Sequence, residues 1–434
     1  MQKQNTPGGK NNKPRNTSYF KSHVGKKPKK ESSAFLDIAK KRQINNYRLA
    51  IFVLFILMLV FGGIIWAGSC MGSMAGSGDS DSLTGKDDNL FASHTQSPPQ
   101  STDGDPGITD DPTVPSQNSE YNGVYLNIEK IESLSSLQSF IDNIKAHGIN
   151  AVNIDIKKED GSFPFYINDE TDAAMKAAGR LDYIVIPIDQ IIELLRENGL
   201  YVSGTIACFK DNYRSGQLID EAIKDSSVAA SHWKDADGNN WLNPYSNSAR
   251  NYISGILAES VKLGFDEIIL SWFFFPTAVS SVSYGDDDGA RNVIIGDFIE
   301  TQRQSLDDIA PHVKLGLNIP LNYFLGASKE TTGLDPNYLI EKKMCNFLAT
   351  SFSPHHVTSS MTIDGKKISD PESEPYETVS ALCSHFKYIY EKINFRPYLQ
   401  VLSGFGNESF IAQRQALDDS GIKTFQLVND DNNY

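Results

Sequence analysis

The sequence predicts an α/β protein whose main domain is a (β/α)8 TIM barrel, preceded by a single transmembrane helix and a disordered stalk. Three observations predict this architecture: eight short apolar runs follow residue 121, amphipathic stretches separate them, and an uncharged apolar run stands near the N-terminus. The chain has 434 residues, of which 40% are hydrophobic and 22% are charged. This composition excludes wholesale disorder and is enough for one large domain or two ordinary ones.

The eight apolar runs have the length and composition of buried parallel strands. They occupy residues 123–128, 151–156, 201–209, 267–273, 313–319, 347–352, 398–402 and 424–428. Eight β-then-α units fit a (β/α)8 barrel over residues 121–434. The competing architecture is an open doubly wound sheet, which usually has fewer units and a glycine-rich phosphate turn after its first strand. That turn is absent here, where the sequence reads Asn127-Ile128-Glu129-Lys130, so we favour the barrel.

Amphipathic stretches between these runs predict helices. They include residues 136–147, 188–198, 249–263, 295–309, 377–393 and 409–420. Glycine stands at the end of four of them, at Gly148, Gly199, Gly264 and Gly421. A glycine there can adopt the left-handed backbone conformation that ends a helix just before the next strand.

Residues 49–68 form an uncharged run that is long enough to span a membrane. Twenty helical residues at about 1.5 Å each cover a hydrocarbon core of about 30 Å. A buried core helix rarely excludes polar groups on every side, and the charged region of a cleavable signal peptide is usually short, whereas 48 residues precede this run. The sequence Ala67-Gly68-Ser69-Cys70 partly matches a lipoprotein cleavage site but lacks the usual leucine. We therefore predict a transmembrane helix.

Charge is distributed unevenly along the chain. Residues 1–48 hold 13 Lys and Arg against two acids, a net charge of +11, so the rest carries −25 within the total of −14. The positive-inside rule predicts a cytoplasmic, disordered tail at 1–48, with residues 121–434 extracytoplasmic at the cell membrane. We interpret the tail as a topology signal attracted to anionic lipid, and the acidic body argues against nucleic acid as a partner. Residues 69–120, with nine acids against Lys86, predict a flexible Ser/Gly/Asp/Pro stalk.

The sequence indicates no metal site and no cofactor. The cysteines form no CxxC pair, which argues against both a zinc site and a disulfide framework. They stand at Cys70, Cys208, Cys345 and Cys383. The neighbouring His355 and His356 have no evident third ligand.

Polar and aromatic residues follow the predicted strands at their carboxyl ends, which form the active face of such a barrel. The substrate-binding candidates are Lys157, Lys210, Trp272, Asn318, His355, Gln400 and Asn429. Rings stack on the apolar faces of sugars while amides and charged groups bind the hydroxyls, so this set suits a polysaccharide. Trp272 and the phenylalanines after it could instead be core residues.

Hydrolysis of a glycosidic bond needs two carboxyl groups on either side of that bond. Asp155 and Asp211 are the best-placed pair at the strand ends, and we take them as catalytic candidates. The alternative is that Asp155 and Lys157 form a buried ion pair at the top of the barrel. The fourth strand has no acid at its exit, and Asp266 and Glu267 stand at its start, on the face associated with stability.

Several motifs in the body resemble those of the bacterial putative glycosyl hydrolase domain family. They are Asn150-Ala151-Val152-Asn153-Ile154-Asp155-Ile156-Lys157, Cys208-Phe209-Lys210-Asp211, Trp233, Trp241-Leu242-Asn243-Pro244-Tyr245, Gly264-Phe265-Asp266-Glu267-Ile268, Phe275-Pro276, Arg396-Pro397-Tyr398-Leu399-Gln400 and Leu427-Val428-Asn429. The resemblance spans essentially all of residues 121–434. It implies a TIM barrel of an exported or membrane-anchored protein with a glycosidase-like site.

The chain departs from the family pattern at the fourth strand. The family usually reads Gln-Phe-Asp-Tyr-(Ile/Val)-Arg-Phe-Pro there, whereas Ser271 and Phe274 replace the aspartate and arginine here. Thr205 replaces an arginine of the third strand, and a tyrosine-proline-serine-histidine pattern is loosened to Phe352-Ser353-Pro354-His355. Losing a catalytic carboxylate typically costs several powers of ten in rate.

Two functions therefore remain open. The first is a membrane-anchored extracytoplasmic barrel that binds envelope or environmental polysaccharide through a degenerate catalytic site. The alternative is an active glycosidase in which Asp155 and Asp211 form the acid/base pair.

Overall fold

A computed structural model describes residues 120–177, 186–228, 230–277, 281–285, 289–326, 329–354, 360–402 and 404–434. The predicted tail at 1–48 and the transmembrane helix at 49–68 lie outside the described residues, as does the predicted stalk at 69–120 except for Glu120. Within the described ranges, no helix has the length and apolar character needed to cross a membrane.

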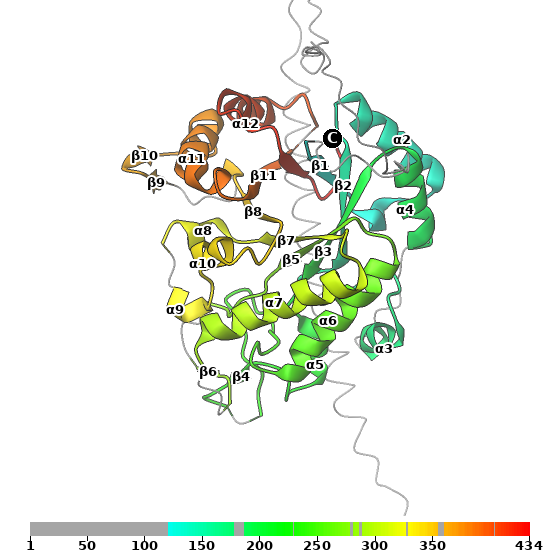
Figure 1. Ribbon diagram of the computed structural model, residues 1–434, viewed down its shortest axis with the longest axis vertical. Coiled ribbons are helices and arrows are strands. Elements are labelled where there is room, and N and C mark those ends of the chain that lie inside the picture. The colour runs from blue at the N-terminus through cyan, green and yellow to red at the C-terminus, as the bar shows by residue number, and fades with distance from the viewer. Residues whose placement is uncertain are drawn as a thin grey trace, which may run out of the picture. The chain divides into compact units, whose positions relative to one another are not determined.

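Eight parallel strands close into a barrel, which confirms the predicted (β/α)8 barrel (Figure 1). They are β1 (Asn122–Tyr125), β2 (Ala151–Lys157), β3 (Tyr201–Ala207), β5 (Glu267–Ser271), β7 (Lys314–Asn318), β8 (Phe347–Ser351), β11 (Asn394–Gln400) and β12 (Phe425–Val428). Each strand pairs with the next barrel strand along the chain, and β12 closes the ring on β1. All eight strands lie in the predicted apolar runs or overlap them.

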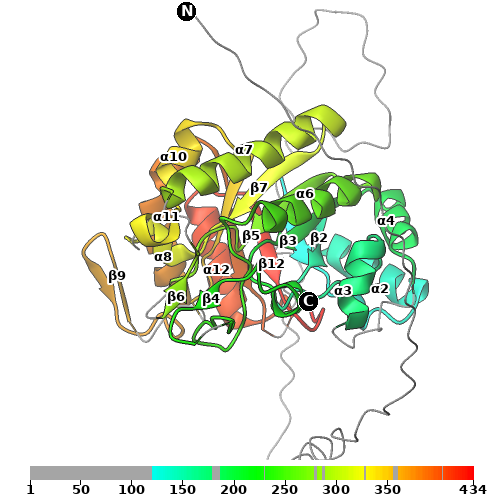
Figure 2. The ribbon, with the colours of Figure 1, turned by 90° about the horizontal axis from the view of Figure 1, so that it is seen from below.

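Helices connect the strands and surround them, as the views in Figures 1 and 2 show. They are η1 (Ile128–Lys130), α2 (Leu134–Ala146), α3 (Asp169–Ala177), α4 (Ile188–Glu197), α5 (Asn212–Gln217), α6 (Asn247–Lys262), α7 (Arg291–Ile309), α8 (Leu321–Phe324), α9 (Lys329–Thr332), α10 (Pro336–Glu341), α11 (Pro375–Tyr390) and α12 (Glu408–Asp419). The helices α2, α4, α6 and α12 are followed by the predicted glycines, whose φ angles of 72° to 94° fall in the left-handed region. The capping prediction is therefore confirmed.

Two small antiparallel pairs lie outside the barrel. In one, β4 (Lys224–Asp225) pairs with β6 (Val282–Ser283), and in the other, β9 (Met361–Ile363) pairs with β10 (Lys366–Ile368). Asp364 and Gly365 connect β9 to β10 with positive φ angles of 49° and 80°, as a two-residue hairpin turn requires. Asp-Gly is a hairpin signal in the sequence, but it lies outside the strand-helix units that apolar periodicity predicts.

The amino end of the barrel interior is closed by a buried ion pair. Arg396 of β11 donates to both carboxylate oxygens of Glu267 at the start of β5, at 2.7 and 3.1 Å. The guanidinium carbon also lies 3.3 Å from the ring centroid of Tyr121 and 3.9 Å from that of Phe347. Glu267 is therefore a structural residue at the amino end of β5, as the sequence predicted.

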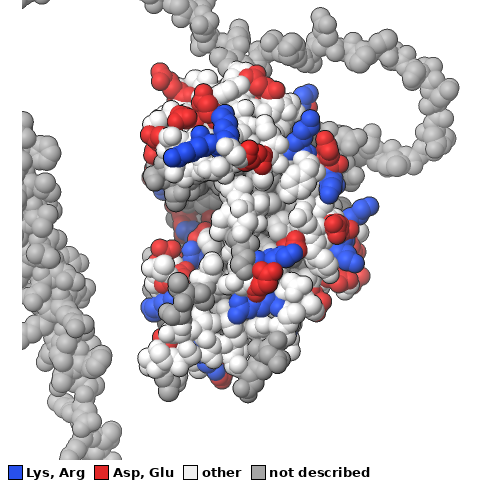
Figure 3. Space-filling model, turned by 90° about the vertical axis from the view of Figure 1, so that its left-hand side faces the viewer, with Lys and Arg blue, Asp and Glu red and all other residues white. Residues whose placement is uncertain are grey.

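On the side of the barrel seen in Figure 3, acidic and basic side chains are interspersed. Some ion pairs of the barrel domain join neighbouring turns of one helix, as in α7, where Arg303 Nη2 lies 2.6 Å from Asp307 Oδ1. Such exposed pairs contribute little to stability.

Candidate active site at the carboxyl ends of the strands

A cavity of about 310 Å³ opens at the carboxyl ends of the barrel strands, and we call it the carboxyl-end cavity. Its lining includes residues from all eight barrel strands and from the loops that follow β2, β5, β8 and β12. Sequence candidates in this lining are Asp155, Lys157, Trp272, Asn318 and Gln400. The barrel therefore brings five of the nine predicted site residues to one cavity.

Asp155 is the carboxyl group of the barrel wall in this cavity. The ladder between β2 and β3 shifts register between Asp155 and Lys157, so a local bulge re-aims the end of β2. The hydroxyl of Tyr125, at the end of β1, donates a hydrogen bond of 2.7 Å to Asp155 Oδ2. Burial raises the pKa of Asp155 to about 6, and Glu159 and Asp430 add to the rise while Tyr125 opposes it. A carboxyl group that holds its proton near neutral pH can serve as a general acid.

Asp211 does not line the cavity, although the sequence paired it with Asp155. It is fully buried, its Oδ1 accepts from the backbone N of Arg214 at the start of α5, and its Oδ2 lies 3.1 Å from Lys157 Nζ. Lys157 also donates to the backbone oxygens of Ala207 at 2.6 Å and Lys210 at 3.2 Å. The buried ion pair at the top of β2 is thus Lys157–Asp211, whereas the sequence alternative joined Lys157 to Asp155. Both groups have structural partners, which favours a positioning role.

Trp272 presents a partly exposed ring at the cavity. Its φ of 52° lies in the left-handed region, which costs a non-glycine residue about 1–2 kcal/mol and often marks a functional position. Lys210 Nζ lies 4.2 Å from the centroid of the Trp272 ring and 2.8 Å from Glu159 Oε2. Lys210 itself is not part of the cavity lining. Because it contacts both Glu159 and the Trp272 indole, it keeps these two side chains close together. The phenylalanines at 273–275 are buried, as core residues are.

The predicted amide residues divide into two groups. Asn318 and Gln400 line the cavity, and the hydroxyl of Ser353 donates to Gln400 Oε1 at 2.9 Å. Asn429 is instead buried in the C-terminal turn, where its Nδ2 donates to the backbone oxygens of Val401 and Asn433 at 2.7 and 2.8 Å. Asn429 therefore shapes the end of the chain. His355 lies outside the described residues.

The positions that depart from the family pattern hold neutral side chains. Ser271 is buried at the cavity, and Thr205 donates to Asn153 Oδ1 at 3.0 Å inside the barrel. Phe274 is buried and packs against Tyr323, with ring centroids 5.0 Å apart. A charged side chain at position 271 or 274 would be buried and would need a partner.

Two tyrosines and a glutamate of the cavity were missed as site candidates in the sequence. Tyr125 and Tyr398 come from β1 and β11, and Glu159 comes from the loop after β2. Asp430, among the polar residues at the end of the eighth predicted strand, also lines the cavity. The Tyr398 hydroxyl is buried, and no described residue is its hydrogen-bond partner. Side chains alternate between the two faces of a strand, so this alternation in β1 and β11 could have identified Tyr125 and Tyr398 as residues that face the barrel interior. The position of Glu159, by contrast, depends on the conformation of the loop after β2. Glu159 thus brings a second carboxylate to the cavity where β5 supplies only Ser271.

The described residues contain no group of three or more His, Cys, Asp or Glu side chains arranged to hold a metal ion. The functional groups of the cavity lining are carboxylates, amides, hydroxyls, the amino groups of two lysines and one indole ring.

Comparisons with solved structures find proteins that are similar to this chain. The glycoside hydrolase domain of PgaB (BpsB) from Bordetella bronchiseptica is 14% identical with a TM-score of 0.53, and the match covers 72% of this chain and 94% of that chain. A hypothetical protein from Ruminiclostridium thermocellum ATCC 27405 is 28% identical over 45% of this chain and 96% of that chain, with a TM-score of 0.39. The glycoside hydrolase domain of PelA from Pseudomonas aeruginosa is 11% identical, with a TM-score of 0.37 and coverage of 73% and 96%.

The likeness to the Bordetella domain concerns the fold, because the identity is low. A comparison with curated proteins finds no match. A family model described as "Putative glycosyl hydrolase domain" matches residues 123–434, which is the whole barrel. The chain therefore belongs to this family of glycosyl-hydrolase-like TIM-barrel domains.

Proposed function

We propose that this protein is a membrane-anchored, extracytoplasmic barrel that binds an envelope or environmental polysaccharide in the carboxyl-end cavity. The observation that carries this proposal is the combination of the Trp272 ring with the amides of Asn318 and Gln400 at one opening. An indole face can stack on the apolar face of a sugar ring, and the amides can bind its hydroxyl groups. The strained backbone at Trp272 supports a role beyond core packing.

Binding is tested with the full chain and a panel of bacterial envelope and environmental polysaccharides. We expect Trp272→Ala to weaken binding of the recognised glycan by about tenfold, since stacking an aromatic ring contributes on the order of 1 kcal/mol or more. Tyr166→Ala is the matched control, because Tyr166 is an exposed aromatic residue outside the cavity lining. Equal loss in both variants, or unchanged binding in Trp272→Ala, would contradict the proposed site.

A second candidate function is glycoside hydrolysis, and the raised pKa of Asp155 favours it. Asp155 would protonate the leaving oxygen, and a second carboxylate would act as nucleophile or base. Glu159 and Asp430 line the same cavity, so they are better placed for the second role than Asp211. In a degenerate site, by contrast, Glu159 stays paired with Lys210 and the bound glycan is not cleaved.

Turnover of the recognised glycan separates the two functions. If the protein is a hydrolase, Asp155→Asn abolishes the release of product. The second carboxylate is then Glu159 if Glu159→Gln loses activity, or Asp430 if Asp430→Asn loses activity. If the protein is a binding module, wild type binds the glycan without releasing product. Ser271→Asp, which restores the carboxylate expected on β5, is then the informative gain-of-function variant.

The proposed anchor is residues 49–68, with the basic tail on the cytoplasmic side. Protease added to intact cells or spheroplasts should then degrade the barrel and leave a small membrane-bound fragment that contains the tail. A barrel protected until the membrane is permeabilised would reverse the proposed orientation.

A further inference from the structure

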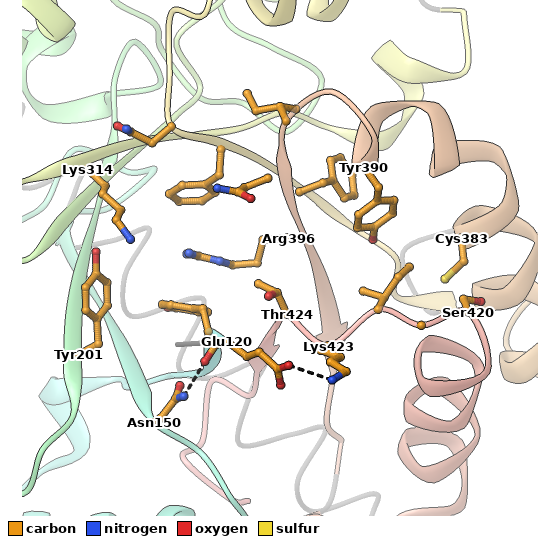
Figure 4. Close-up of a pocket in the computed structure, with 18 of the residues that line it drawn as sticks. Glu120, Asn150, Tyr201, Lys314, Cys383, Tyr390, Arg396, Ser420, Lys423 and Thr424 are labelled. Atoms are coloured by element: carbon orange, nitrogen blue, oxygen red, sulfur yellow. Dashed lines mark hydrogen bonds and ion pairs between the residues drawn. The ribbon is translucent and has the colours of Figure 1, made fainter. Parts of the chain in front are cut away.

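A second cavity, of about 1120 Å³, lies at the amino ends of the barrel strands, and we call it the amino-end cavity. Its wall includes Tyr201, Lys314 and Arg396 from the barrel strands and a stripe of α11. Residues of that stripe recur at helical spacing and lie on one face: Tyr376, Ser380, Cys383, Ser384 and Lys387. Figure 4 shows Arg396 extending across the middle of this cavity, between Tyr201 and Lys314 on one side and Tyr390 on the other.

The lining carboxylates of this cavity already have partners. Glu120 lies 3.1 Å from Lys423, Glu267 pairs with Arg396, and Asp266 pairs with Arg196. Asp419 accepts a hydrogen bond of 2.8 Å from the hydroxyl of Tyr376.

Two lysines of the cavity lining have no acidic partner of this kind. Lys314 contacts the face of the Tyr201 ring at 5.6 Å, and neither Lys314 nor Lys387 has an acidic partner among the described residues. Arg396 is 5% exposed, and its Nε has no hydrogen-bond partner within the described part of the chain. The cavity therefore offers cationic groups to an acidic occupant.

The chain itself enters the barrel at this cavity. Glu120, the first described residue, is part of the wall, where its backbone oxygen accepts from Asn150 Nδ2 at 2.6 Å (Figure 4). Residue 119 is one peptide bond away, within about 3.8 Å between Cα atoms. Ten further residues in extended conformation reach roughly 33 Å, which is more than enough to cross the barrel end.

The preceding segment has the charge and composition that fit this cavity. Residues 105–119 contain Asp105, Asp110 and Asp111 and no Lys or Arg. Three prolines favour an extended chain that cannot form its own helix, and Ile108 and Val114 are the large apolar residues between them.

We propose that residues 105–119 dock in the amino-end cavity, with their aspartates facing Lys314 and Lys387. The last part of the predicted stalk then becomes a fixed extension of the barrel. This interaction is independent of glycan binding, because it uses the opposite end of the barrel from the carboxyl-end cavity. A charge attraction of this kind weakens as salt concentration rises.

Hydrogen–deuterium exchange of the full chain tests the docking. We expect amides of residues 105–119 to exchange at least about tenfold more slowly than those of residues 90–104, which share the polar composition of the stalk. The double variant Lys314→Glu/Lys387→Glu should remove this protection. Lys366→Glu/Lys367→Glu, on exposed positions of β10, is the charge-matched control and should leave it unchanged.

A charge-swap variant tests whether the loss of protection in Lys314→Glu/Lys387→Glu is caused only by loss of folding. Adding Asp105→Lys, Asp110→Lys and Asp111→Lys to the Lys314→Glu/Lys387→Glu variant should restore protection of residues 105–119. Equal exchange of the two stalk segments in wild type would overturn the proposal, and so would protection that survives Lys314→Glu/Lys387→Glu. Protection of the α11 stripe that increases with protein concentration would also overturn it, because it would assign the cavity to a second copy of the chain.

Discussion

Asp155 combines burial with a single strong hydrogen-bond donor, the hydroxyl of Tyr125. That hydrogen bond stabilises the charged carboxylate, so removing it favours the protonated form. We therefore expect Tyr125→Phe to raise the pKa of Asp155 above its present value of about 6. Carboxyl carbon NMR titration measures this directly. Tyr166→Phe removes a hydroxyl that donates to Asp169 outside the cavity lining, and it should leave the Asp155 titration unchanged.

The same carboxyl group makes stability depend on pH. The pKa of Asp155 is about 6 in the folded protein against 3.8 as the ordinary value, so the folded state holds the proton more tightly. The resulting stabilisation is fully present below pH 3.8 and is lost as pH rises through about 6. A difference of about two pKa units corresponds to roughly 3 kcal/mol at most.

Asp155→Asn removes this ionisation. We expect the variant to exceed wild type in free energy of unfolding at pH 7, by up to about 3 kcal/mol, and to match it near pH 4. Urea unfolding at the two pH values measures the difference. A destabilised Asp155→Asn variant at pH 7 would show that the carboxylate is better solvated than its burial indicates.

At the scale of elements, the strand order and most strand bounds followed from apolar periodicity, because a parallel barrel buries both faces of its strands. The seventh strand was predicted to begin at Tyr398, yet β11 begins at Asn394. Pro397 lacks an N–H to donate to a ladder, yet Arg396 and Pro397 pair in register with Ala349 and Thr350 of β8. The ion pair with Glu267 and the stacked rings around Arg396 hold this segment in the barrel.

The candidate site was only partly predictable, because apolar periodicity locates the strand ends but not the side chains of bulges, turns and loops. Strand ends identified Asp155, Trp272, Asn318 and Gln400, because the fold fixes where those ends lie. A bulge and a turn after β3 decide that Asp211 faces Lys157, and neither leaves a periodic signal in the sequence. Side chains from loops, such as Glu159, depend on conformations that apolar spacing does not encode.

The Glu267–Arg396 pair joins β5 to β11 across the barrel, so breaking it should loosen both strands. Glu267→Gln leaves a buried guanidinium without a counter-charge, and we expect a loss of about 3–5 kcal/mol in free energy of unfolding. Glu259→Gln breaks an exposed ion pair with Lys262 on α6 and should cost less than about 1 kcal/mol. Urea unfolding of both variants makes the comparison, and similar small losses would mean that water reaches Arg396.

At the scale of the whole molecule, the barrel separates two sites. The carboxyl-end cavity holds Asp155 and Trp272, and the amino-end cavity holds Lys314 and Lys387. TIM barrels generally keep chemistry at the carboxyl ends of the strands and stability at the amino ends, and the Glu267–Arg396 pair follows this division.

This separation predicts that changes at the two ends act independently. Sites without shared partners usually contribute additively, so Lys314→Glu/Lys387→Glu should release residues 105–119 while glycan affinity stays within about twofold of wild type. Trp272→Ala should do the reverse, weakening glycan binding while hydrogen exchange of residues 105–119 is unchanged. A triple variant tests additivity directly, because its glycan affinity should equal that of Trp272→Ala alone. A further loss of affinity in the triple variant would mean that the docked stalk segment and the carboxyl-end cavity are coupled through the barrel, and the two ends would then have to be treated as one allosteric unit.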